Sequence, residues 1–533
     1  MTRSHPSPGD RRTAGAPGRS TPPGEAPHRA TRTAPTAGAT AAPPPAATDD
    51  DVPLGLALDR LAEQAPDAPA VTCGEVTLSR RDLARASNRY ARALAERGVR
   101  AGDRVTIGLP NGVEFYVATV ATWKLGATPQ PVSARLPRHE LAAVVDVADP
   151  RVVVGLPTTD GRPSLPAGFT PDPALSDAPL PPAVPPHWKA PTSGGSTGRP
   201  KVILSAGEGV ARSLLSRAAF LRITRGTTML VTAPLYHNAP FTFSCIALAN
   251  AGHVVVMPRF DPADVLAHIT RHRPTWVYMV PTLMGRVLRL PEHVRARADL
   301  SSVETLFHIG APCPEHVKRG WLAWVTRPEV VLEHYSGTEA IAFTAIDGAE
   351  WLRHPGSVGR VVAGEIRVTD EHFRELPRGQ VGEIWMRPPG GRPTYRYLGA
   401  TARRHRGWES LGDLGYLDHD GYLYLADRRT DMILVGGANV YPAEVEAALE
   451  AHPAVSSAVV IGLPDPDLGN RVHAIVHTTA PVTDDELAAH TRTRLAPHKQ
   501  PHTFERSDHP LRDDAGKVRR SALRAARLPA AHR

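Results

Sequence analysis

Short apolar runs alternate with amphipathic stretches along most of the chain from about residue 51. Short, β-branched runs bounded by turn residues are typical of buried strands. Five runs fit this description: Arg104–Leu109, Arg151–Gly155, Met229–Ala233, Val254–Met257 and Trp276–Val280. Each lies near a stretch with helical spacing of its apolar residues. The alternation predicts an α/β fold whose layers are built on a largely parallel sheet.

One helix start is marked by Ser79-x-x-Asp82, a capping box in which each side chain bonds the backbone N–H of the other residue. Apolar residues then recur at helical spacing: Leu83, Ala86, Tyr90 and Leu94. In contrast, residues 157–188 are rich in Pro and Ser and are expected to form a loop.

The pattern divides the chain into unequal parts. Residues 1–50 hold almost no large apolar side chain, so we expect a disordered Pro/Ala-rich tail. Residues 51–427 predict a large N-terminal domain of layered sheets and helices, and the pattern changes at 428–431, the expected hinge. Residues 432–528 predict a small mobile α+β domain, in which Pro442 opens a helix and Ala458–Gly462 forms a strand. Residues 529–533 form a short tail.

Composition excludes several classes of protein. A chain of 533 residues with 41% hydrophobic and 22% charged residues is globular and long enough for at least two packed units. No apolar run reaches the roughly 18 residues that a transmembrane helix needs. The start of the chain lacks a secretory signal pattern, and the three cysteines are too far apart for a disulfide framework or a paired metal motif. These features predict a cytoplasmic protein.

The net charge of +8 reflects a general surplus of arginine, because only six of the 62 basic residues are lysine. The basic residues are not clustered and aromatic residues make up only 5% of the chain, so no nucleic-acid partner is expected. The rarity of lysine makes each one informative, since arginine does not replace a compact, mobile ammonium group.

The densest chemical signal is Pro191-Thr-Ser-Gly-Gly-Ser-Thr-Gly-Arg-Pro-Lys201. Glycines let backbone N–H groups turn toward an anion, hydroxyls add donors and the lysine adds charge, which favours a polyphosphate ligand. The run is also formally the G-x-S-x-G nucleophile elbow of serine hydrolases, with Ser196 as nucleophile. Pro200 argues against that alternative, because a helix must follow the nucleophile. A Walker A loop would need glycine and lysine to be adjacent.

This segment resembles the phosphate loop of the adenylate-forming enzymes, which include acyl-CoA synthetases, peptide-synthetase adenylation domains and firefly-type luciferases. Further motifs match the family in order over about residues 54–528. The resemblance implies a large N-terminal domain and a small C-terminal domain that rotates between two half-reactions. It also implies that ATP, Mg²⁺ and coenzyme A are used.

The resemblance assigns nucleotide contacts to several segments. The phosphate loop contributes Thr192, Ser193, Gly194, Gly195, Ser196, Thr197, Gly198 and Lys201. Gly310, Ala311 and Pro312 correspond to the adenine-side loop, and Tyr335 to the residue that stacks on adenine. Asp413 and Arg428 correspond to ribose or phosphate contacts.

Catalytic and metal roles follow in the same way. His237 marks the carboxylate end of the acid site, Thr338 contacts phosphate, and Thr197 and Glu339 are assigned to Mg²⁺. Gly437 lines the channel for the thiol arm and Lys517 is the adenylation lysine. The family's pivot position, often Asp or Lys, is Thr430 here, which leaves the control of the hinge open.

These assignments predict an ATP-dependent carboxylic acid–CoA ligase that acts through acyl-AMP. A stand-alone enzyme that loads a separate carrier protein is the main alternative; a serine hydrolase using Ser196 and an inactive adenylate-binding module are more distant ones. The residues expected near the acid, Asn238, Ala239, Phe241 and Phe243, include no cation for a second carboxylate. A hydrophobic monocarboxylic acid is therefore expected; its chain length, aromaticity and ring content stay open.

Overall fold

The computed structural model describes residues 51–158, 160–194, 200–435, 438–513 and 516–528. The predicted tails at 1–50 and 529–533 lie outside these ranges. Residues Asp49–Arg533 belong to one compact unit. Among the described residues, no helix combines the length and the apolar character needed to cross a membrane.

A nine-stranded sheet forms the centre of the large domain, in the order β15-β14-β13-β12-β11-β9-β10-β1-β2. Six strands, from β13 to β1 in this order, are parallel, and the pairs β1–β2, β13–β14 and β14–β15 at the edges are antiparallel. The strand bounds are β1 Pro69–Cys73, β2 Val76–Ser79, β9 Thr228–Val231, β10 His253–Val256, β11 Trp276–Met279, β12 Thr305–His308, β13 Val331–Tyr335, β14 Phe343–Asp347 and β15 Arg360–Ala363. The predicted largely parallel sheet is confirmed.

A second, four-stranded sheet has the order β4-β3-β5-β6, and all of its pairs are parallel. Its strands are β3 Arg104–Ile107, β4 Thr128–Pro131, β5 Val152–Val154 and β6 Ser164–Leu165. All five strands predicted from apolar runs are therefore present, and each bound lies within two residues of the prediction. The predicted loop at 157–188 holds only the short β6 in its described part.

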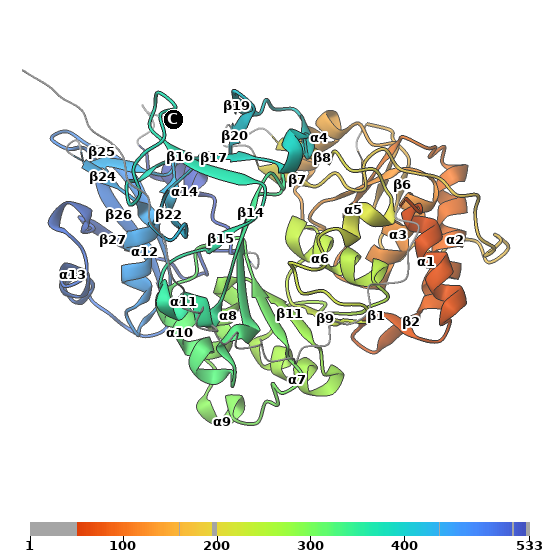
Figure 1. The fold of residues 1–533 in the computed structure, drawn as a ribbon, viewed down its shortest axis with the longest axis horizontal. Helices are drawn as coiled ribbons and strands as arrows, with labels where there is room; N and C mark the ends of the chain where they lie inside the picture. Colours follow the sequence, from red (N-terminus) through yellow and green to blue (C-terminus); the bar gives the residue numbers. More distant parts are fainter. Residues whose placement is uncertain (1–50, 159, 195–199, 436–437, 514–515, 529–533) are drawn as a thin grey trace, which may run out of the picture. The chain divides into compact units, whose positions relative to one another are not determined.

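Helices cover these sheets (Figure 1). Those of the large domain are α1 Leu54–Gln64, α2 Arg80–Glu96, α3 Val113–Lys124, α4 Arg138–Ala148, α5 Ala211–Leu215, α6 Asn238–Ala249, α7 Pro262–His272, α8 Pro281–Leu288, α9 Glu292–Arg295, α10 Glu315–Trp324 and α11 Gly348–Arg353. The predicted capping box at Ser79 and Asp82 is present at the start of α2. One continuous core joins helices and sheets and contains four fully buried tryptophans: Trp123, Trp188, Trp276 and Trp321.

Two antiparallel sheets complete the large domain. A six-stranded sheet contains β16 Glu365–Thr369, β17 Gly382–Arg387, β19 Arg403–His405, β20 Trp408–Ser410, β21 Asp413–Leu417 and β22 Leu423–Arg428. A three-stranded sheet contains β7 Thr192–Gly194, β8 Pro200–Ser205 and β18 Tyr395–Leu398. The second sheet brings the predicted phosphate loop beside a segment about 200 residues further along the chain.

The small domain has its own apolar core, centred on residues such as Val445, Leu449, Val460 and Val476. Its elements, drawn in blue shades, group around the long β25–β26 hairpin (Figure 1). They are β23 Ile433–Val435, β24 Ala438–Val440, α12 Pro442–Glu450, β25 Val455–Asp465, β26 Gly469–Thr478, α13 Asp484–Arg492, β27 Thr503–Arg506 and α14 Arg520–Arg527. The predicted helix at Pro442 and strand at Ala458–Gly462 are confirmed.

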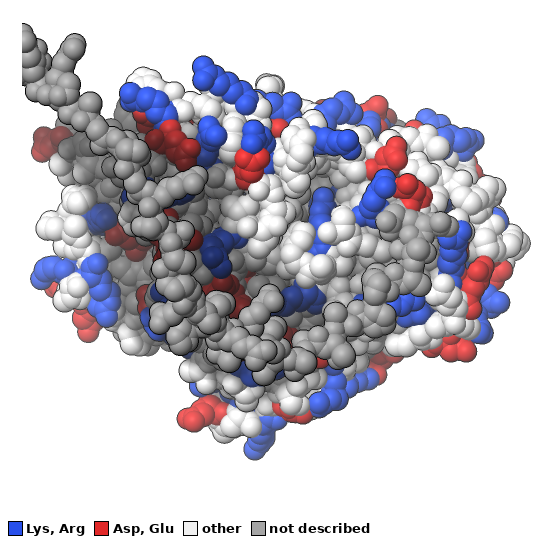
Figure 2. Space-filling view, viewed as in Figure 1, with Lys and Arg blue, Asp and Glu red and all other residues white. Residues whose placement is uncertain are grey.

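The charged side chains are mixed on the face of the molecule shown in Figure 2. Where described residues form that face, lysine and arginine lie among acidic residues and make no continuous basic stripe. Many surface arginines have a carboxylate partner, as in the pairs Arg271–Glu75 and Arg387–Glu365. Such exposed pairs contribute little to stability and locally neutralise the arginine surplus.

Candidate active site

Two antiparallel strands, β7 and β8, flank the predicted phosphate loop. β7 pairs antiparallel with β8, with Thr192 opposite Val202 and Ser193 opposite Lys201. The Thr192 hydroxyl accepts a hydrogen bond from Gln130 Nε2 at 3.0 Å. Gly194 ends β7, while Gly195, Ser196, Thr197 and Gly198 lie outside the described residues, so their assignment stays a prediction.

The hairpin does not support the serine hydrolase alternative. A nucleophile elbow places its serine between a strand and a helix, whereas Pro200 here opens the strand β8. Pro200 suits this position because a proline at the first residue of a strand removes no essential ladder hydrogen bond.

A buried carboxylate lies next to the hairpin. Glu339 is 5% exposed, and its Oε1 accepts hydrogen bonds from Lys201 Nζ at 3.1 Å and from the Tyr397 hydroxyl. Lys201 Nζ also lies 4.2 Å from the centroid of the Tyr397 ring. Burial and the nearby Glu339 charge raise the pKa of Tyr397, so the phenol stays protonated as a donor. Strands β8 and β18 thus deliver a cation and a donor to one carboxylate.

The backbone around Glu339 is held in a tight turn. The Ala340 N–H donates to the Gly337 carbonyl at 3.0 Å, and Ala340 has φ +54°. A left-handed conformation costs a residue other than glycine about 1 kcal/mol. The Thr394 hydroxyl donates to the Glu339 carbonyl at 2.7 Å and helps to hold the turn. Thr338 lies in this turn and is half-buried.

Tyr335, Asp413 and Arg428 form a second linked group. The Tyr335 hydroxyl donates to Asp413 Oδ2 at 2.7 Å, and Arg428 Nε lies 3.1 Å from Asp413 Oδ1. The register of β21 and β22 places Asp413 directly opposite Arg428. Burial and then Asp413 raise the pKa of Tyr335, while the Asp413 charge raises that of Arg428. Three residues predicted to bind one nucleotide therefore lie together, although two of them come from a different sheet.

His237 is the residue just before α6. Its Nε2 is buried and has no hydrogen-bond partner among the described residues, and its ring centroid lies 4.1 Å from that of Tyr236. Burial, and then the Lys517 charge, lower the pKa of His237 to about 3, so the imidazole is neutral near pH 7. A neutral histidine with a free nitrogen can donate to or accept from a polar group of a bound molecule.

The loop that carries Lys517 packs against the adenine-side loop. A Cβ added at Gly516 would lie 3.1 Å from Thr282 Oγ1 and 3.6 Å from the Ala311 Cβ, and Gly516 has φ +72°. Within the loop, the Lys517 N–H donates to Asp513 Oδ1 at 2.8 Å. Only glycine fits this close approach and this backbone conformation.

Lys517 retains solvent exposure, yet nearby protein atoms lower the pKa of its ammonium from the ordinary value. Partial desolvation of the ammonium by these atoms is the main cause; the Asp513 and Glu339 charges oppose the shift, and the Arg428 charge adds to it. These influences place Lys517 within electrostatic reach of Glu339 and of Arg428, one residue from each of the two groups described above.

The remaining predicted contacts are less defined. Gly310 has φ +97° and open space where a Cβ would be, and Pro312 is exposed. Gly437 lies outside the described residues. At the predicted hinge, residues 428–431 form a turn in which the Asp431 N–H donates to the Arg428 carbonyl at 2.9 Å. Its role as a hinge stays a prediction.

Two residues at the site were not predicted to be there. Tyr397 lies 58 positions from Glu339, and no local motif marks it. Lys189 donates to Asn238 Oδ1 and, at 2.8 Å, to Thr242 Oγ1. The four acid-site residues named from the sequence include no cation, but the structure adds Lys189 to them from outside that set. The scarcity of lysine was the available signal, but sequence alone could not show that residue 189 meets α6.

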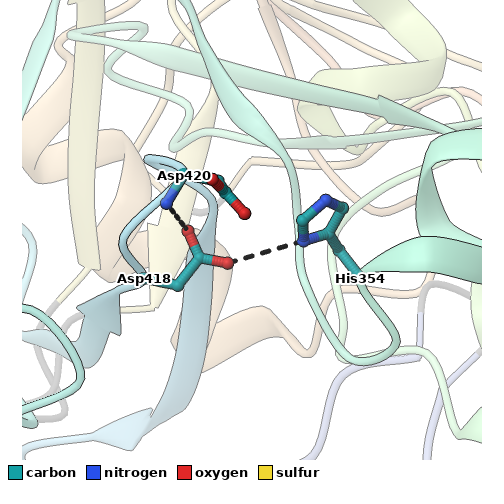
Figure 3. A group of neighbouring side chains, drawn as sticks. All are labelled: His354, Asp418 and Asp420. Atoms are coloured by element: carbon teal, nitrogen blue, oxygen red, sulfur yellow. Dashed lines mark hydrogen bonds and ion pairs between the residues drawn. The ribbon is translucent and has the colours of Figure 1, made fainter.

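A separate group, His354, Asp418 and Asp420, has the composition of a metal site (Figure 3). Asp418 is already used by protein donors: its Oδ1 accepts from the Asp420 and Tyr422 N–H groups at 3.0 and 2.8 Å. Its Oδ2 accepts from the Tyr424 hydroxyl at 3.2 Å. Such hydrogen bonds are typical of a polar turn, here the one before β22. They explain why these residues lie together, so no metal ion needs to be invoked.

Comparisons with known proteins agree with this geometry. The family model described as AMP-binding enzyme matches residues 58–396, and that of the AMP-binding enzyme C-terminal domain matches residues 444–512. A feruloyl-CoA synthase from Amycolatopsis sp. is 33% identical over 488 residues, covering 87% of this chain and 97% of the relative.

Solved structures give the same result. The o-succinylbenzoate CoA synthetase from Bacillus subtilis, in complex with its acyl-adenylate intermediate, aligns with a TM-score of 0.76 and 27% identity, covering 89% of this chain and 98% of that chain. The same enzyme in complex with ATP and magnesium ion aligns with a TM-score of 0.75 and 27% identity, over 88% and 98% of the two chains. The chain belongs to the AMP-binding enzymes, the adenylate-forming superfamily that its motifs resemble.

Proposed function

We propose that this AMP-forming acid–CoA ligase activates an acid with a hydrophobic body in two steps. In the first step, a carboxylate oxygen attacks the α-phosphorus of ATP, giving acyl-AMP and pyrophosphate. In the second, the thiol of coenzyme A attacks the acyl carbonyl, giving the thioester, AMP and a proton. The observation that carries the proposal is the Tyr335–Asp413–Arg428 group together with the neighbouring Glu339–Lys201 pair.

The first step joins two anions, so positioning and charge neutralisation must supply most of the catalysis. Asp413 offers carboxylate oxygens to the two hydroxyls of a ribose, and Tyr335 offers a ring face to a base. Lys201, Lys517 and Arg428 supply positive charge around the phosphates. His237, at the start of α6, offers its free nitrogen to the acid's carboxylate.

Glu339 fits the expected magnesium ion. It is a hard oxygen ligand in a buried site, its Oε2 lies close to Gly337, and the hydrogen bonds from Lys201 and Tyr397 both go to Oε1. We assign Mg²⁺ to Glu339 and to Thr197. When bound, the ion neutralises charge on the phosphates of ATP.

The apolar character of α6 supports a hydrophobic acid. Phe241 stacks on Trp188, and Phe243 packs among three rings of the strands β11 and β12, with its centroid 4.9 Å from that of Phe307. Both relatives named above act on aromatic acids according to their names. The three cysteines are free, in keeping with a reducing compartment, and we propose a cytoplasmic enzyme.

Coenzyme A is the proposed thiol. The decisive experiment measures ATP–pyrophosphate exchange with a panel of carboxylic acids, followed by AMP release on addition of coenzyme A. We expect exchange with the preferred acid and AMP release that depends on coenzyme A without any other protein. Release only with an added carrier protein would favour the carrier-loading alternative. No pyrophosphate formation with any acid, ATP and Mg²⁺ would refute the proposal.

Removal of the Glu339 charge tests the metal assignment. We expect Glu339→Gln to lower the rate of adenylate formation about 10²–10³-fold, as for other single electrostatic contacts, and to raise the Mg²⁺ concentration required. The measurement is pyrophosphate exchange over a Mg²⁺ titration.

Glu409→Gln is the matched control. Glu409 is also buried and accepts from a tyrosine hydroxyl, Tyr395, at 2.5 Å, but it lies outside the proposed site. If both variants lose activity equally at the same Mg²⁺ dependence, the loss reflects general damage to the fold and the assignment of Glu339 fails.

A further inference from the structure

Lys189 is a buried cation between the phosphate hairpin and the acid-site helix. It lies three residues before β7 and is 4% exposed. Its ammonium donates to Asn238 and Thr242, which stand one turn apart at the start of α6, and lies 4.6 Å from the centroid of the Trp188 ring. Lys189 therefore lies between the β7–β8 hairpin, which is expected to bind ATP, and α6, which is expected to bind the acid.

The partners of Lys189 differ from those of the other buried lysines. Lys124 bonds Asp59 at 2.6 Å and Lys318 bonds Glu333 at 2.8 Å, so each buried ammonium has a carboxylate. Lys189 contacts only neutral oxygens, and no carboxylate of the described residues lies within ion-pair distance of it. A buried charge without a counterion is costly, typically by several kcal/mol. The site thus lacks an anion.

A second cation, Arg217, adds to the positive charge around Lys189. Arg217 lies just after α5, the helix that packs on α6. Its guanidinium has no acceptor among the described residues, and burial lowers its pKa. Lys189 has a pKa well below its ordinary value, because of burial and then the Arg217 charge; Cys245 and then Glu339 oppose this shift. An anion placed between the two cations would stabilise both.

The hydrogen bonds of Lys189 indicate which anion fits. They direct the ammonium toward α6, whereas the cation that meets Glu339 on the nucleotide side is Lys201. His237 immediately precedes Asn238, and Thr242 lies about 6 Å further along the helix axis, at 1.5 Å per residue. A molecule with one anionic group at His237 would reach Lys189 with a second group only a few bonds away.

We propose that Lys189, together with Arg217, binds a second anionic group, carboxylate or sulfonate, on the acid substrate. The inference rests on the proposed function, which places the reacting carboxylate at His237. It replaces the single carboxylate expected from the sequence with a dianionic acid, while the apolar surroundings of α6 accommodate the body of the molecule between its two charged ends.

The experiment compares matched acids in ATP–pyrophosphate exchange. Dicarboxylic acids of four to eight carbons, with flexible or aromatic bodies, are each tested beside the monoamide of the same skeleton and beside the corresponding sulfonate. For the wild-type protein we expect kcat/KM to be at least tenfold higher for the dianionic acid of the preferred length than for its monoamide. The sulfonate arm shows which anion is preferred.

Substitution of the cations should remove this preference. We expect Lys189→Met to lower kcat/KM for the dianionic acid about 10–100-fold, in the range of hydrogen bonds to charged groups, while the value for the monoamide changes less than threefold. Arg217→Met should act in the same direction. Arg212→Met is the control, because Arg212 lies on α5 but is exposed and paired with Asp51.

The outcomes separate this inference from the proposed function. Equal losses on diacid and monoamide, or no wild-type preference for dianionic acids, would overturn the inference but leave the ligase activity. A raised KM for ATP in Lys189→Met with unchanged acid preference would assign Lys189 to the nucleotide and also overturn it. Exchange with none of the acids would refute the proposed function itself. Thermal unfolding of each variant shows whether the fold is retained.

Discussion

Lys517→Ala is expected to lower the rate of adenylate formation by about 10²–10³-fold, while thioester formation from supplied acyl-AMP is retained. Gly516, in the loop that carries Lys517, packs against Thr282 and Ala311. The Asp513 carboxylate accepts a hydrogen bond from the Lys517 N–H and so holds the backbone in place. The ammonium can then place its charge on the phosphates as they separate. The second step breaks the bond between the acyl carbon and the phosphate oxygen but no bond to phosphorus, and no pyrophosphate leaves, so it should not need this lysine.

The two half-reactions are measured separately, by pyrophosphate exchange and by conversion of synthetic acyl-AMP with coenzyme A. Lys499→Ala is the matched control, since Lys499 belongs to the same small domain but pairs with Glu444 at 2.7 Å. Unchanged exchange in Lys517→Ala would remove the residue from the mechanism. An equal loss in both half-reactions would indicate a structural role.

The largest loss of stability is expected from Lys318→Met. Lys318 is fully buried on α10, where its ammonium lies 2.8 Å from Glu333 Oε2 and 2.7 Å from His308 Nε2. Removing one partner of a buried ion pair typically costs about 3–5 kcal/mol, because the other charge is left without compensation. The shift is measured as a change in the free energy of unfolding by urea.

Two further results would support this reason. The double variant Lys318→Met/Glu333→Leu should recover most of the lost stability, because no buried charge is left unpaired. Burial raises the pKa of Glu333 even though Lys318 opposes the shift. A raised pKa means that the folded state binds a proton more readily, so the destabilisation of Lys318→Met should shrink as the pH falls from 7 toward 5. A double variant no more stable than the single one would contradict the argument.

This ion pair also supports the nucleotide site. His308 ends β12, two residues before Gly310, and Glu333 lies on β13, two residues before Tyr335. Both strands therefore lead directly from the buried pair into predicted adenine contacts. A less stable Lys318→Met protein is also expected to show a raised KM for ATP, which can be read from the same exchange assay.

Local structure was well predicted from the sequence. The capping box at Ser79 and the proline at position 442 each begin a helix, because a cap or a fixed φ acts within a few residues of itself. The buried strands were found because an apolar β-branched run is unfavourable in water wherever it occurs. The motif residues Tyr335 and Glu339 were found in the same way, as a compact local pattern.

The partners of those residues could not be predicted. Asp413 meets Tyr335 from 78 positions away, Tyr397 meets Glu339 from 58, and Lys189 meets Asn238 from 49. Each contact depends on which strands pair and which helix packs on them, and no residue near Lys189 in the chain indicates α6.

By itself, the sequence determined where helices and strands begin, which segments could hold phosphate, and to which superfamily the motifs correspond. These properties depend on forces between near neighbours: capping, turn chemistry and the burial of short apolar runs. Only the tertiary structure decided which charges meet. It gave Lys124 and Lys318 carboxylate partners and left Lys189 with neutral ones, because the environment of a buried charge is set by segments that the fold brings together from distant parts of the chain.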